Sequence, residues 1–245
     1  MIRVAVVENQ FGIVEVFRAE ATGSLVYVQG GCYQTESDAN GVSLVPYIHA
    51  LYGLVLQTRP RDMLMIGCGG GSLGRMLAGA GISVTIVDVN PASIAIARDH
   101  FGLPDSVVCH AGDGAEFLTS SPHKYDAIVS DAFCGDEVPA HLAAPAFFEL
   151  VRKRLNPQRG CLFANIHVMD DSKMTALRYA RKAREVFDYV RLLDARGGIN
   201  RNAIVAAGDV LRLAEPALSL PPLSCAEAVA SELGRLQFSA PLFRK

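Results

Sequence analysis

Several signals that place a protein in a specialised class are missing from this sequence. Its 23 Lys and Arg residues nearly balance 25 Asp and Glu residues, and the net charge of −2 gives no basic footprint for nucleic acid or an anionic membrane surface. The six cysteines are scattered, without a CxxC pair or a His/Cys spacing suited to zinc. We therefore expect no nucleic-acid partner and no metal, and a reducing compartment fits the cysteines.

Long apolar runs are also absent. The most apolar stretch, Leu44 to Leu56, contains Pro46 and His49 and is too short to span a bilayer. The first ten residues alternate apolar and polar side chains, unlike a signal peptide. We expect a cytoplasmic protein with no membrane partner. The six histidines have no HxxxH spacing and no GxSxG elbow occurs, so we expect structural roles for the histidines.

What is present is a globular composition, with 50% hydrophobic and 20% charged residues. Three short strand-like runs come first, at Val4–Val7, Ile13–Arg18 and Leu25–Gln29, separated by turn residues. They predict a small antiparallel β-domain over residues 1–45. A helix from Pro46 to Leu56 leads into the next part of the chain.

From Met63 the rhythm changes to strand, loop and helix, which specifies a parallel sheet with helices on both faces. Buried-strand runs are expected at Met63–Ile66, Val84–Val87, Val107–His110, Ala127–Ser130 and Cys161–Ile166. Two further runs, Val190–Leu193 and Ala203–Ala207, are joined by residues 195–198 with no room for a helix, so they should pair antiparallel.

This layout predicts an α/β protein with a Rossmann-like fold of the S-adenosylmethionine-dependent methyltransferase type. Its sheet is expected to be mostly parallel and seven-stranded, with the N-terminal β-domain added to it. The nucleoside-binding domain is expected over residues 46–213. A C-terminal tail with a short helix should follow over residues 214–245.

The loop after the first parallel strand is rich in glycine, from Gly67 to Gly74. Glycines allow a tight turn and let the backbone approach a ligand where a helix begins. Gly69, Gly71 and Gly74 also satisfy GxGxxG, a motif that alone indicates only a tight strand-to-helix turn. Because the loop stands between a strand and a helix, we expect Gly67, Gly69 and Gly71 to bind a nucleoside.

Acidic residues follow the next two strands. Asp88 stands 21 residues after Gly67, where a carboxylate can accept hydrogen bonds from both ribose hydroxyls, or can help Asn90 cap a helix. Asp113 lies between Gly112 and Gly114, where it can accept from an adenine amino group. The alternative for Asp113 is an Asx-type turn that caps the following helix.

After the fourth strand comes Asp131, at the position where a catalytic group would stand over the bound nucleoside. Asp136 and Glu137 follow in the same loop and can equally be solvated charges. Ligands bind beyond the carboxyl ends of the strands in such a sheet, so these acids should converge on one cleft.

With these residues assembled, the chain resembles the spermidine synthase (polyamine aminopropyltransferase) family, in its divergent bacterial spermidine synthase-like branch. The segments that carry the resemblance are Met63–Gly74, Val84–Asn90, residues 112–114 and Tyr125–Asp131 with the GDEVP loop, together with Gln34 and Asp38 of the β-domain. About residues 10 to 210 are covered.

The resemblance implies an enzyme that transfers an aminopropyl group from decarboxylated S-adenosylmethionine to a small-molecule amine, acting as a homodimer. Asp88 would hold the ribose, Asp113 with Gly114 the adenine, and Asp131 would be the catalytic aspartate. Three further positions would line the donor and amine pocket: Gln34, Tyr47 and Asp136.

Two positions depart from the family pattern. Gly70 stands where spermidine synthases usually carry an acid that grips the donor's ammonium group, and Cys134 stands at the second catalytic-loop acid. A methyltransferase that uses intact S-adenosylmethionine is therefore the alternative. An NAD-dependent oxidoreductase, suggested by GxGxxG, and a non-catalytic nucleoside-binding protein are the other two interpretations.

Overall fold

The N-terminal part of the chain forms a separate antiparallel sheet. The computed structural model describes residues 1–195 and 197–243. The sheet consists of four strands in sequential order: β1 (Ile2–Asn9), β2 (Gly12–Arg18), β3 (Leu25–Gln29) and β4 (Cys32–Ser37). The sequence predicted the first three strands. It did not predict β4, which carries Gln34.

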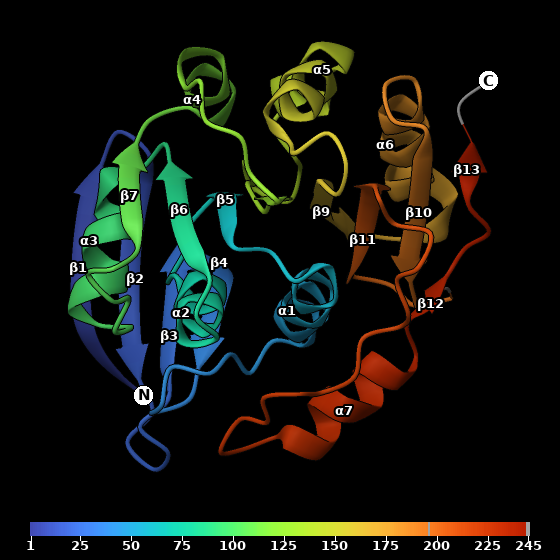
Figure 1. The fold of residues 1–245 in the computed structure, drawn as a ribbon. Coiled ribbons are helices and arrows are strands. Elements are labelled where there is room, and N and C mark those ends of the chain that lie inside the picture. Colours follow the sequence, from blue (N-terminus) through green and yellow to red (C-terminus); the bar gives the residue numbers. More distant parts are fainter. Residues whose placement is uncertain (196, 244–245) are drawn as a thin grey trace.

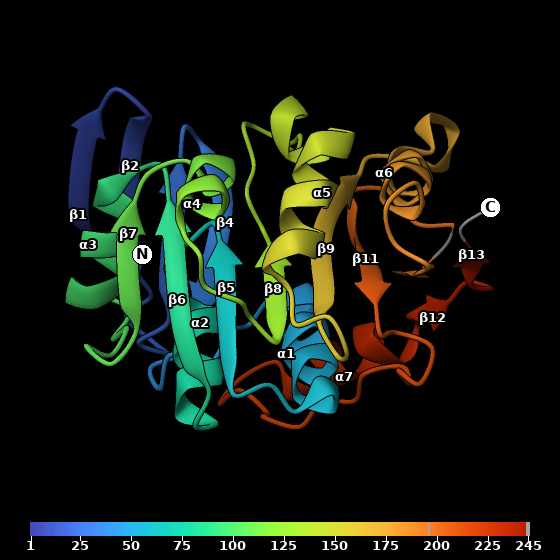
Figure 2. The same ribbon diagram turned by 45° about the horizontal axis from the view of Figure 1, so that its top comes forward.

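The main sheet contains the seven strands expected from the sequence. They are β5 (Asp62–Ile66), β6 (Ser83–Asp88), β7 (Val108–Ala111), β8 (Ala127–Ser130), β9 (Cys161–Val168), β10 (Tyr189–Asp194) and β11 (Arg201–Gly208). Their spatial order is β10-β11-β9-β8-β5-β6-β7, and Figure 2 shows most of this row. Strands β5 to β9 are mutually parallel, whereas β11 runs antiparallel to both β9 and β10. The predicted terminal hairpin is therefore confirmed, although Arg196 in its connection lies outside the described residues.

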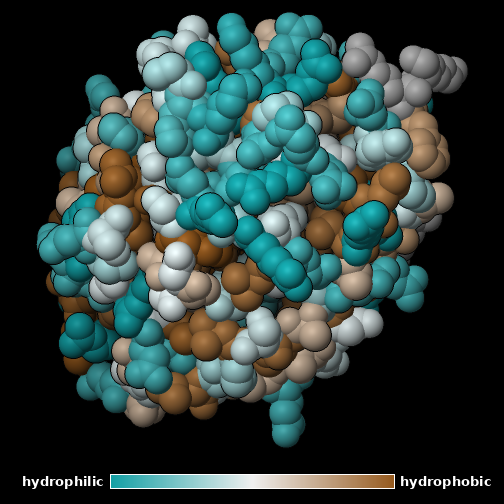
Figure 3. All heavy atoms as spheres, in the orientation of Figure 1, coloured by the Kyte–Doolittle hydropathy of each residue, from teal (hydrophilic) through white to brown (hydrophobic). Residues whose placement is uncertain are grey.

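Helices cover both faces of this sheet (Figure 1). One face packs against α1 (Pro46–Thr58), α2 (Ser72–Gly79) and α3 (Pro91–Asp99). The other packs against α4 (Gly114–Ser120), α5 (Pro145–Arg154) and α6 (Thr175–Arg184), with the short 3₁₀ turns η1 (Ala140–Ala143) and η2 (Asp171–Lys173) nearby. In Figure 3, hydrophilic side chains gather over the region of α4 and α5, so the outer surfaces of these helices are solvated.

The central strands read as continuous apolar runs because both of their faces are buried. In β5, Met63 and Met65 belong to the core under α1 and α2, whereas Leu64 and Ile66 belong to the core under α4 and α5. This period of two follows from the alternation of side chains along a strand.

The tail adds more to the main sheet than the sequence predicted. Beyond the expected helix, α7 (Ala226–Gly234), it forms β12 (Gln237–Phe238) and β13 (Leu242–Phe243), which both pair with β10. The guanidinium carbon of Arg191 lies 3.7 Å from the centroid of the Phe238 ring, and Arg191 also donates to the carbonyl of Leu213. These contacts hold the tail on the last strand of the sheet.

The N-terminal sheet docks on α3 and on the glycine loop. Tyr27 shares a hydrogen bond of 2.8 Å with Ser93 and packs edge-on against Phe101. The backbone N–H of Gly70 donates to the Thr35 hydroxyl of β4 at 2.9 Å. β4 is therefore held beside the carboxyl end of β5. Within the described residues, no helix is long and apolar enough to cross a membrane.

Candidate active site

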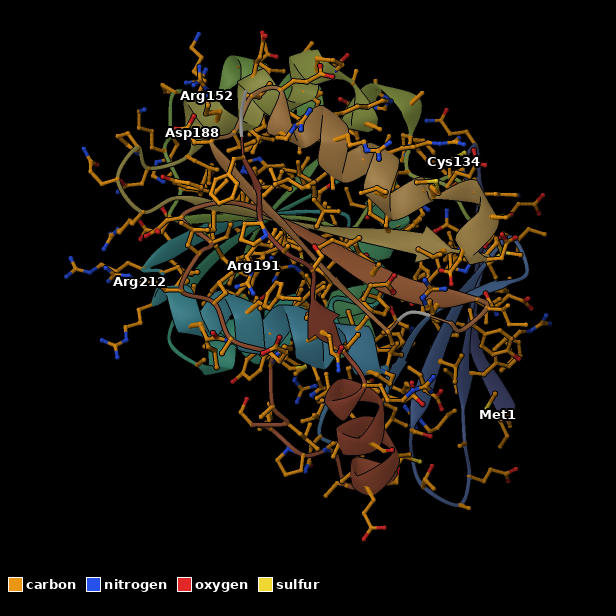
Figure 4. All side chains as sticks on the ribbon, turned by 90° about the vertical axis from the view of Figure 1, so that its right-hand side faces the viewer. Met1, Cys134, Arg152, Asp188, Arg191 and Arg212 are labelled. Carbon is orange, nitrogen blue, oxygen red and sulfur yellow. The ribbon has the colours of Figure 1, made fainter. Side chains whose placement is uncertain are left out.

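A cavity of about 880 Å³ opens at the carboxyl ends of the parallel strands. Cys134, in the loop after β8, lies at the end of the molecule toward which β9 points, and Arg212 lies at the opposite end (Figure 4). Nine of the ten residues predicted for the site line the cavity: Gln34, Tyr47, Gly67, Gly69, Asp88, Asp113, Gly114, Asp131 and Asp136. The tenth, Gly71, does not.

Gly71 instead starts helix α2. Its φ of +75° is left-handed, and a Cβ there would lie 3.0 Å from the side chain of Ala97. Its freedom from a side chain thus serves the turn into α2 and the packing of α3 rather than the cavity wall.

The backbone of the loop after β8 comes so close to position 67 that only glycine fits there. A Cβ on Gly67 would lie 2.1 Å from the backbone carbonyl oxygen of Asp131, and the φ of Gly67 is +97°. In return, the Asp131 N–H donates to the carbonyl of Ile66 at 2.8 Å. The glycine therefore lets the strand ends of β5 and β8 meet at the cavity floor.

Asp88 ends β6 and already binds the glycine loop. Its two carboxylate oxygens accept backbone N–H bonds from Cys68 and Asn90, both at 2.7 Å. Burial raises the pKa of Asp88, although N–H donors from Asn90, Cys68 and Gly69 act in the opposite direction. A carboxylate has lone pairs for further donors, so ribose hydroxyls can join these bonds.

Asp113 caps helix α4, as the alternative interpretation of the sequence held. One carboxylate oxygen accepts from the backbone N–H groups of Ala115 and Glu116, and the other lies 2.7 Å from Nε2 of His141. Burial alone would raise the pKa of Asp113, but the Glu116 N–H bond, the His141 contact and the Ala115 bond together lower it. His141 lines the cavity and was not expected to do so.

Asp131 is held by one donor on each of its carboxylate oxygens. Asn165 Nδ2 donates to Oδ1 at 2.8 Å, and the Tyr47 hydroxyl donates to Oδ2 at 3.3 Å. Burial raises the pKa of Asp131 to about 6, against the effect of these two donors. Burial and the nearby Asp131 charge also raise the pKa of Tyr47 well above its ordinary value, so Tyr47 keeps its proton. Asp131 can therefore exchange a proton near neutral pH.

Most of a polar wall built from β9 and β11 was not predicted from the sequence. Four side chains of this wall line the cavity: Asn165, His167, Asn200 and Asn202. The sequence does contain a signal for the part of this wall that β9 supplies. Every second residue of β9 lies on one face, and on that face Cys161 and Phe163 are followed by Asn165 and His167. The same face of the strand is apolar under α1 and polar where it meets the cavity.

The cavity is strongly acidic. Five carboxylate side chains line it: Glu36, Asp88, Asp113, Asp131 and Asp136. Among the described residues that line it there is no Lys or Arg. The field therefore favours cations. In the described ranges, 1–195 and 197–243, no group of three or more His, Cys, Asp or Glu side chains could hold a metal ion.

The two departures from the family pattern occupy different places. Gly70 does not line the cavity, and a Cβ there would lie 2.9 Å from Cγ2 of Thr35 and 3.1 Å from the ring of Phe101. Cys134 is exposed and forms a tight turn with Glu137. Neither position brings a carboxylate to the cavity, but Asp136 in the same loop does.

Part of the chain matches a known protein family and known enzymes in sequence. The family model "Methyltransferase domain" matches residues 63–158. A polyamine aminopropyltransferase of Chromobacterium violaceum is 34% identical over 122 residues, which cover 47% of this chain and 46% of that protein. A probable polyamine aminopropyl transferase of Bifidobacterium longum is 27% identical over 135 residues, 54% of this chain and 30% of that protein.

Solved structures of spermidine synthases have a similar fold. A probable spermidine synthase from Corynebacterium glutamicum aligns with a TM-score of 0.77, covering 96% of this chain and 90% of that chain at 18% identity. A spermidine synthase in complex with the transition state analogue AdoDATO aligns with a TM-score of 0.65, 84% and 71% coverage and 19% identity. The chain is similar to spermidine synthases in its fold, and over part of its length to polyamine aminopropyltransferases in its sequence.

The methyltransferase-type fold predicted from the sequence is thus confirmed, as is the resemblance to the spermidine synthases. The matches to the curated relatives are partial, because they span less than half the length of either aminopropyltransferase. The matched segments and the structural alignment support the fold over nearly the whole spermidine synthase-like chain.

Proposed function

We propose that this spermidine synthase-like chain is a transferase that moves an aminopropyl group from an S-adenosylmethionine-type donor to a small-molecule amine. The observation that carries the proposal is the cavity around Asp131, which is lined by five carboxylates and, among its described residues, no Lys or Arg. A sulfonium donor and an alkylammonium acceptor are both cations, and such a cavity attracts both. The relatives named polyamine aminopropyltransferase support the same reaction.

The donor nucleoside would lie along the glycine loop. In this proposal Gly67 and Gly69 bring the backbone close to it, Asp88 accepts from its ribose hydroxyls, and Asp113 with Gly114 meets the adenine. Asp113 retains lone pairs for an adenine amino group beyond the three donors it already has.

Asp131 would act as the base. An alkylammonium has a pKa near 10, as lysine does, so the acceptor arrives protonated. Asp131 attracts this cation, orients it with Tyr47, and accepts a proton as the nitrogen attacks. The new C–N bond forms at the carbon next to the sulfonium sulfur, the C–S bond breaks, and the electron pair leaves with methylthioadenosine. Positioning supplies much of the acceleration, because the sulfonium is already an activated leaving group. Gln34 and Asp136 would line the amine side of the cavity.

A methyltransferase is the second candidate. It is compatible with the loop from Gly67 to Ser72, which offers no carboxylate to repel the carboxylate of intact S-adenosylmethionine. The match to the methyltransferase domain model is compatible with this chemistry as well.

Product analysis decides between the two reactions. The protein is incubated with either form of the donor and a panel of diamines and polyamines, and the released nucleosides are measured by mass spectrometry. Methylthioadenosine identifies aminopropyl transfer, whereas S-adenosylhomocysteine with a methylated acceptor identifies the second candidate. Release of neither product with any pair, together with tight nucleoside binding, would support a non-catalytic binding protein.

Two further expectations, the first from the resemblance and the second from the sequence pattern, remain proposals. One is that the chain acts as a homodimer, and the other is that it works in the cytoplasm.

A further inference from the structure

Two asparagine side chains form a chain of hydrogen bonds that ends on Asp131. Asn202 Nδ2 donates to Asn165 Oδ1 at 3.0 Å, and Asn165 Nδ2 donates to Asp131 Oδ1 at 2.8 Å. Asn165 is 1% exposed. A buried amide without hydrogen-bond partners would cost free energy, and here both the NH₂ group and the oxygen of Asn165 have a partner.

The strand register places the three residues in line. In the antiparallel pair of β9 and β11, Asn165 faces Ile204 and Asn202 faces His167, so the two asparagines are diagonal neighbours on one face. β8 lies on the other side of β9, and Asp131 directly follows it. The polar chain therefore crosses from β11 over β9 to the end of β8.

Asp131 and Asn202 together fix the direction of the Asn165 amide. An amide has a donor end and an acceptor end, and Asn165 could in principle point either toward Asp131. The ionised carboxylate of Asp131 can only accept, so it requires the NH₂ group of Asn165, and Asn202 donates to the oxygen that remains. The reversed amide would place two acceptors together at Asp131 and two donors together at Asn202, which is unfavourable at both contacts.

This arrangement leaves the two carboxylate oxygens of Asp131 unequal. Oδ1 takes the short bond from the directed amide, whereas Oδ2 has the longer bond of 3.3 Å from the hydroxyl of Tyr47. The hydrogen bond to Oδ2 is the weaker of the two. Oδ2 is therefore the oxygen with more capacity for a further proton.

We propose that Asn165, directed by Asn202, is a positioning residue that occupies Oδ1 and so presents Oδ2 of Asp131 to the acceptor amine. The inference rests on the proposed function for the identity of the amine, and on the hydrogen bonds alone for the orientation of the carboxylate. Other titratable groups that share the cavity come from several elements: Glu36, Tyr47, Asp88, Asp113, Asp136, His141 and His167. Among the residues that the structure describes, Asn165 and Tyr47 donate side-chain hydrogen bonds to the Asp131 carboxylate.

The test replaces the inner amide by a side chain of similar size without donors, Asn165→Val. The matched control is Asn156→Val. Asn156 is also an amide that donates to an aspartate, Asp126, but at the amino end of β8, whereas Asp131 follows the carboxyl end. Loss of the donor disfavours the charged carboxylate, so the acid limb of the kcat profile should move upward by about one pH unit. We expect kcat to fall about tenfold with little change in the donor KM, and Asn202→Ala to show a smaller shift in the same direction. Asn156→Val should leave the profile in place.

A second readout does not depend on turnover. Protein labelled with ¹³C at the aspartate carboxyl carbons is titrated by NMR, and the Asp131 signal is assigned by its loss in Asp131→Asn. A higher pKa of this signal in Asn165→Val, but not in Asn156→Val, supports the positioning role even if aminopropyl transfer is never detected. An unchanged Asp131 titration in a folded Asn165→Val protein overturns the role, whatever the activity. If Asn165→Val does not fold, Asn202→Ala is read by the same titration, and an unchanged Asp131 signal there overturns the directing role of Asn202.

Discussion

The hydroxyl of Tyr47 donates a hydrogen bond to Oδ2 of Asp131 across a sequence separation of 84 residues. Tyr47 lies in the first turn of α1, and Asp131 follows the last residue of β8. The segment that links the two sheets thus supplies a neutral donor to the proposed base. The contact also explains why the start of α1 belongs to the cavity wall while the rest of that helix is core.

The first prediction concerns turnover. Asp131→Asn keeps the shape of the side chain and removes its capacity to accept a proton, so the rate should fall by about 10²–10⁴-fold. Donor affinity should stay within a few-fold, because the nucleoside is proposed to lie on Asp88 and Asp113. Steady-state rates of nucleoside release and calorimetry of donor binding measure the two effects. Equal rates for the variant and the original protein would exclude Asp131 as the base under either chemistry.

The second prediction concerns stability and pH. The pKa of Asp131 is raised from 3.8 to about 6 by burial, so between these values the folded protein holds a proton that the unfolded chain has released. Folding stability therefore decreases as pH rises through this window, and the loss persists at higher pH. Asp131→Asn removes this cost, and should be more stable than the original by on the order of 1–2 kcal/mol at pH 7–8, after allowance for the partial exposure of Asp131.

Denaturant unfolding at several pH values checks the direction of this change in the free energy of unfolding. The advantage of Asp131→Asn should shrink as pH falls from about 6 and should vanish only well below the ordinary pKa of 3.8, where Asp131 is neutral in both states. An advantage that grows toward low pH would mean that the folded protein favours the charged carboxylate.

The third prediction concerns the donor. Asp88→Asn should weaken binding of methylthioadenosine by roughly tenfold to a hundredfold, because a charge-assisted hydrogen bond to ribose is lost. Asn is preferred to Ala here, since its amide oxygen can still accept one of the backbone N–H groups of Cys68 and Asn90 that bond to Asp88. The control is Asp99→Asn at the exposed end of α3. Unchanged affinity in Asp88→Asn, or preferential binding of NAD, would contradict the ribose assignment.

The fourth prediction compares two glycines. Gly67→Ala places a Cβ 2.1 Å from the carbonyl oxygen of Asp131 at a φ of +97°, so it should destabilise the fold by several kcal/mol or shift the loop after β8. Gly79 lies in α2 with nothing within 4 Å of its would-be Cβ, and Gly79→Ala should be neutral or stabilising by up to about 1 kcal/mol. Thermal unfolding of both variants gives the comparison. Similar melting temperatures would show that the close approach at Gly67 is easily relieved.

Much of the fold was predictable because its signals are local. The apolar runs from Met63 onward and the turn residues between them specify a parallel sheet without any knowledge of distant contacts. The fourth N-terminal strand, Cys32–Ser37, was missed because its residues alternate weakly and four of its six residues are polar. The strands β12 and β13 were missed because two-residue strands depend on their partner, β10, rather than on their own sequence.

The site was predictable where glycines and acids follow strands, and less so elsewhere. Asp88, Asp113 and Asp131 were placed at the cavity because strand ends converge on one edge. Asn202 could not be found this way, since it lies at the start of a strand whose antiparallel direction brings it to the same edge. The interaction of His141 with Asp113 depends on how the loop after β8 returns over α4, which no local pattern encodes.

Both donors to Asp131 come from outside residues 63–158, the part of the chain that matches a general methyltransferase domain. Tyr47 precedes this segment and Asn165 follows it. The acids proposed to hold the nucleoside, Asp88 and Asp113, lie within residues 63–158. The two side chains that donate to Asp131 lie on either side of that segment. A chimera that exchanges the flanks around a constant centre would therefore keep Asp131 and change the two side chains that donate to it, so the pH dependence of turnover should follow the flanks.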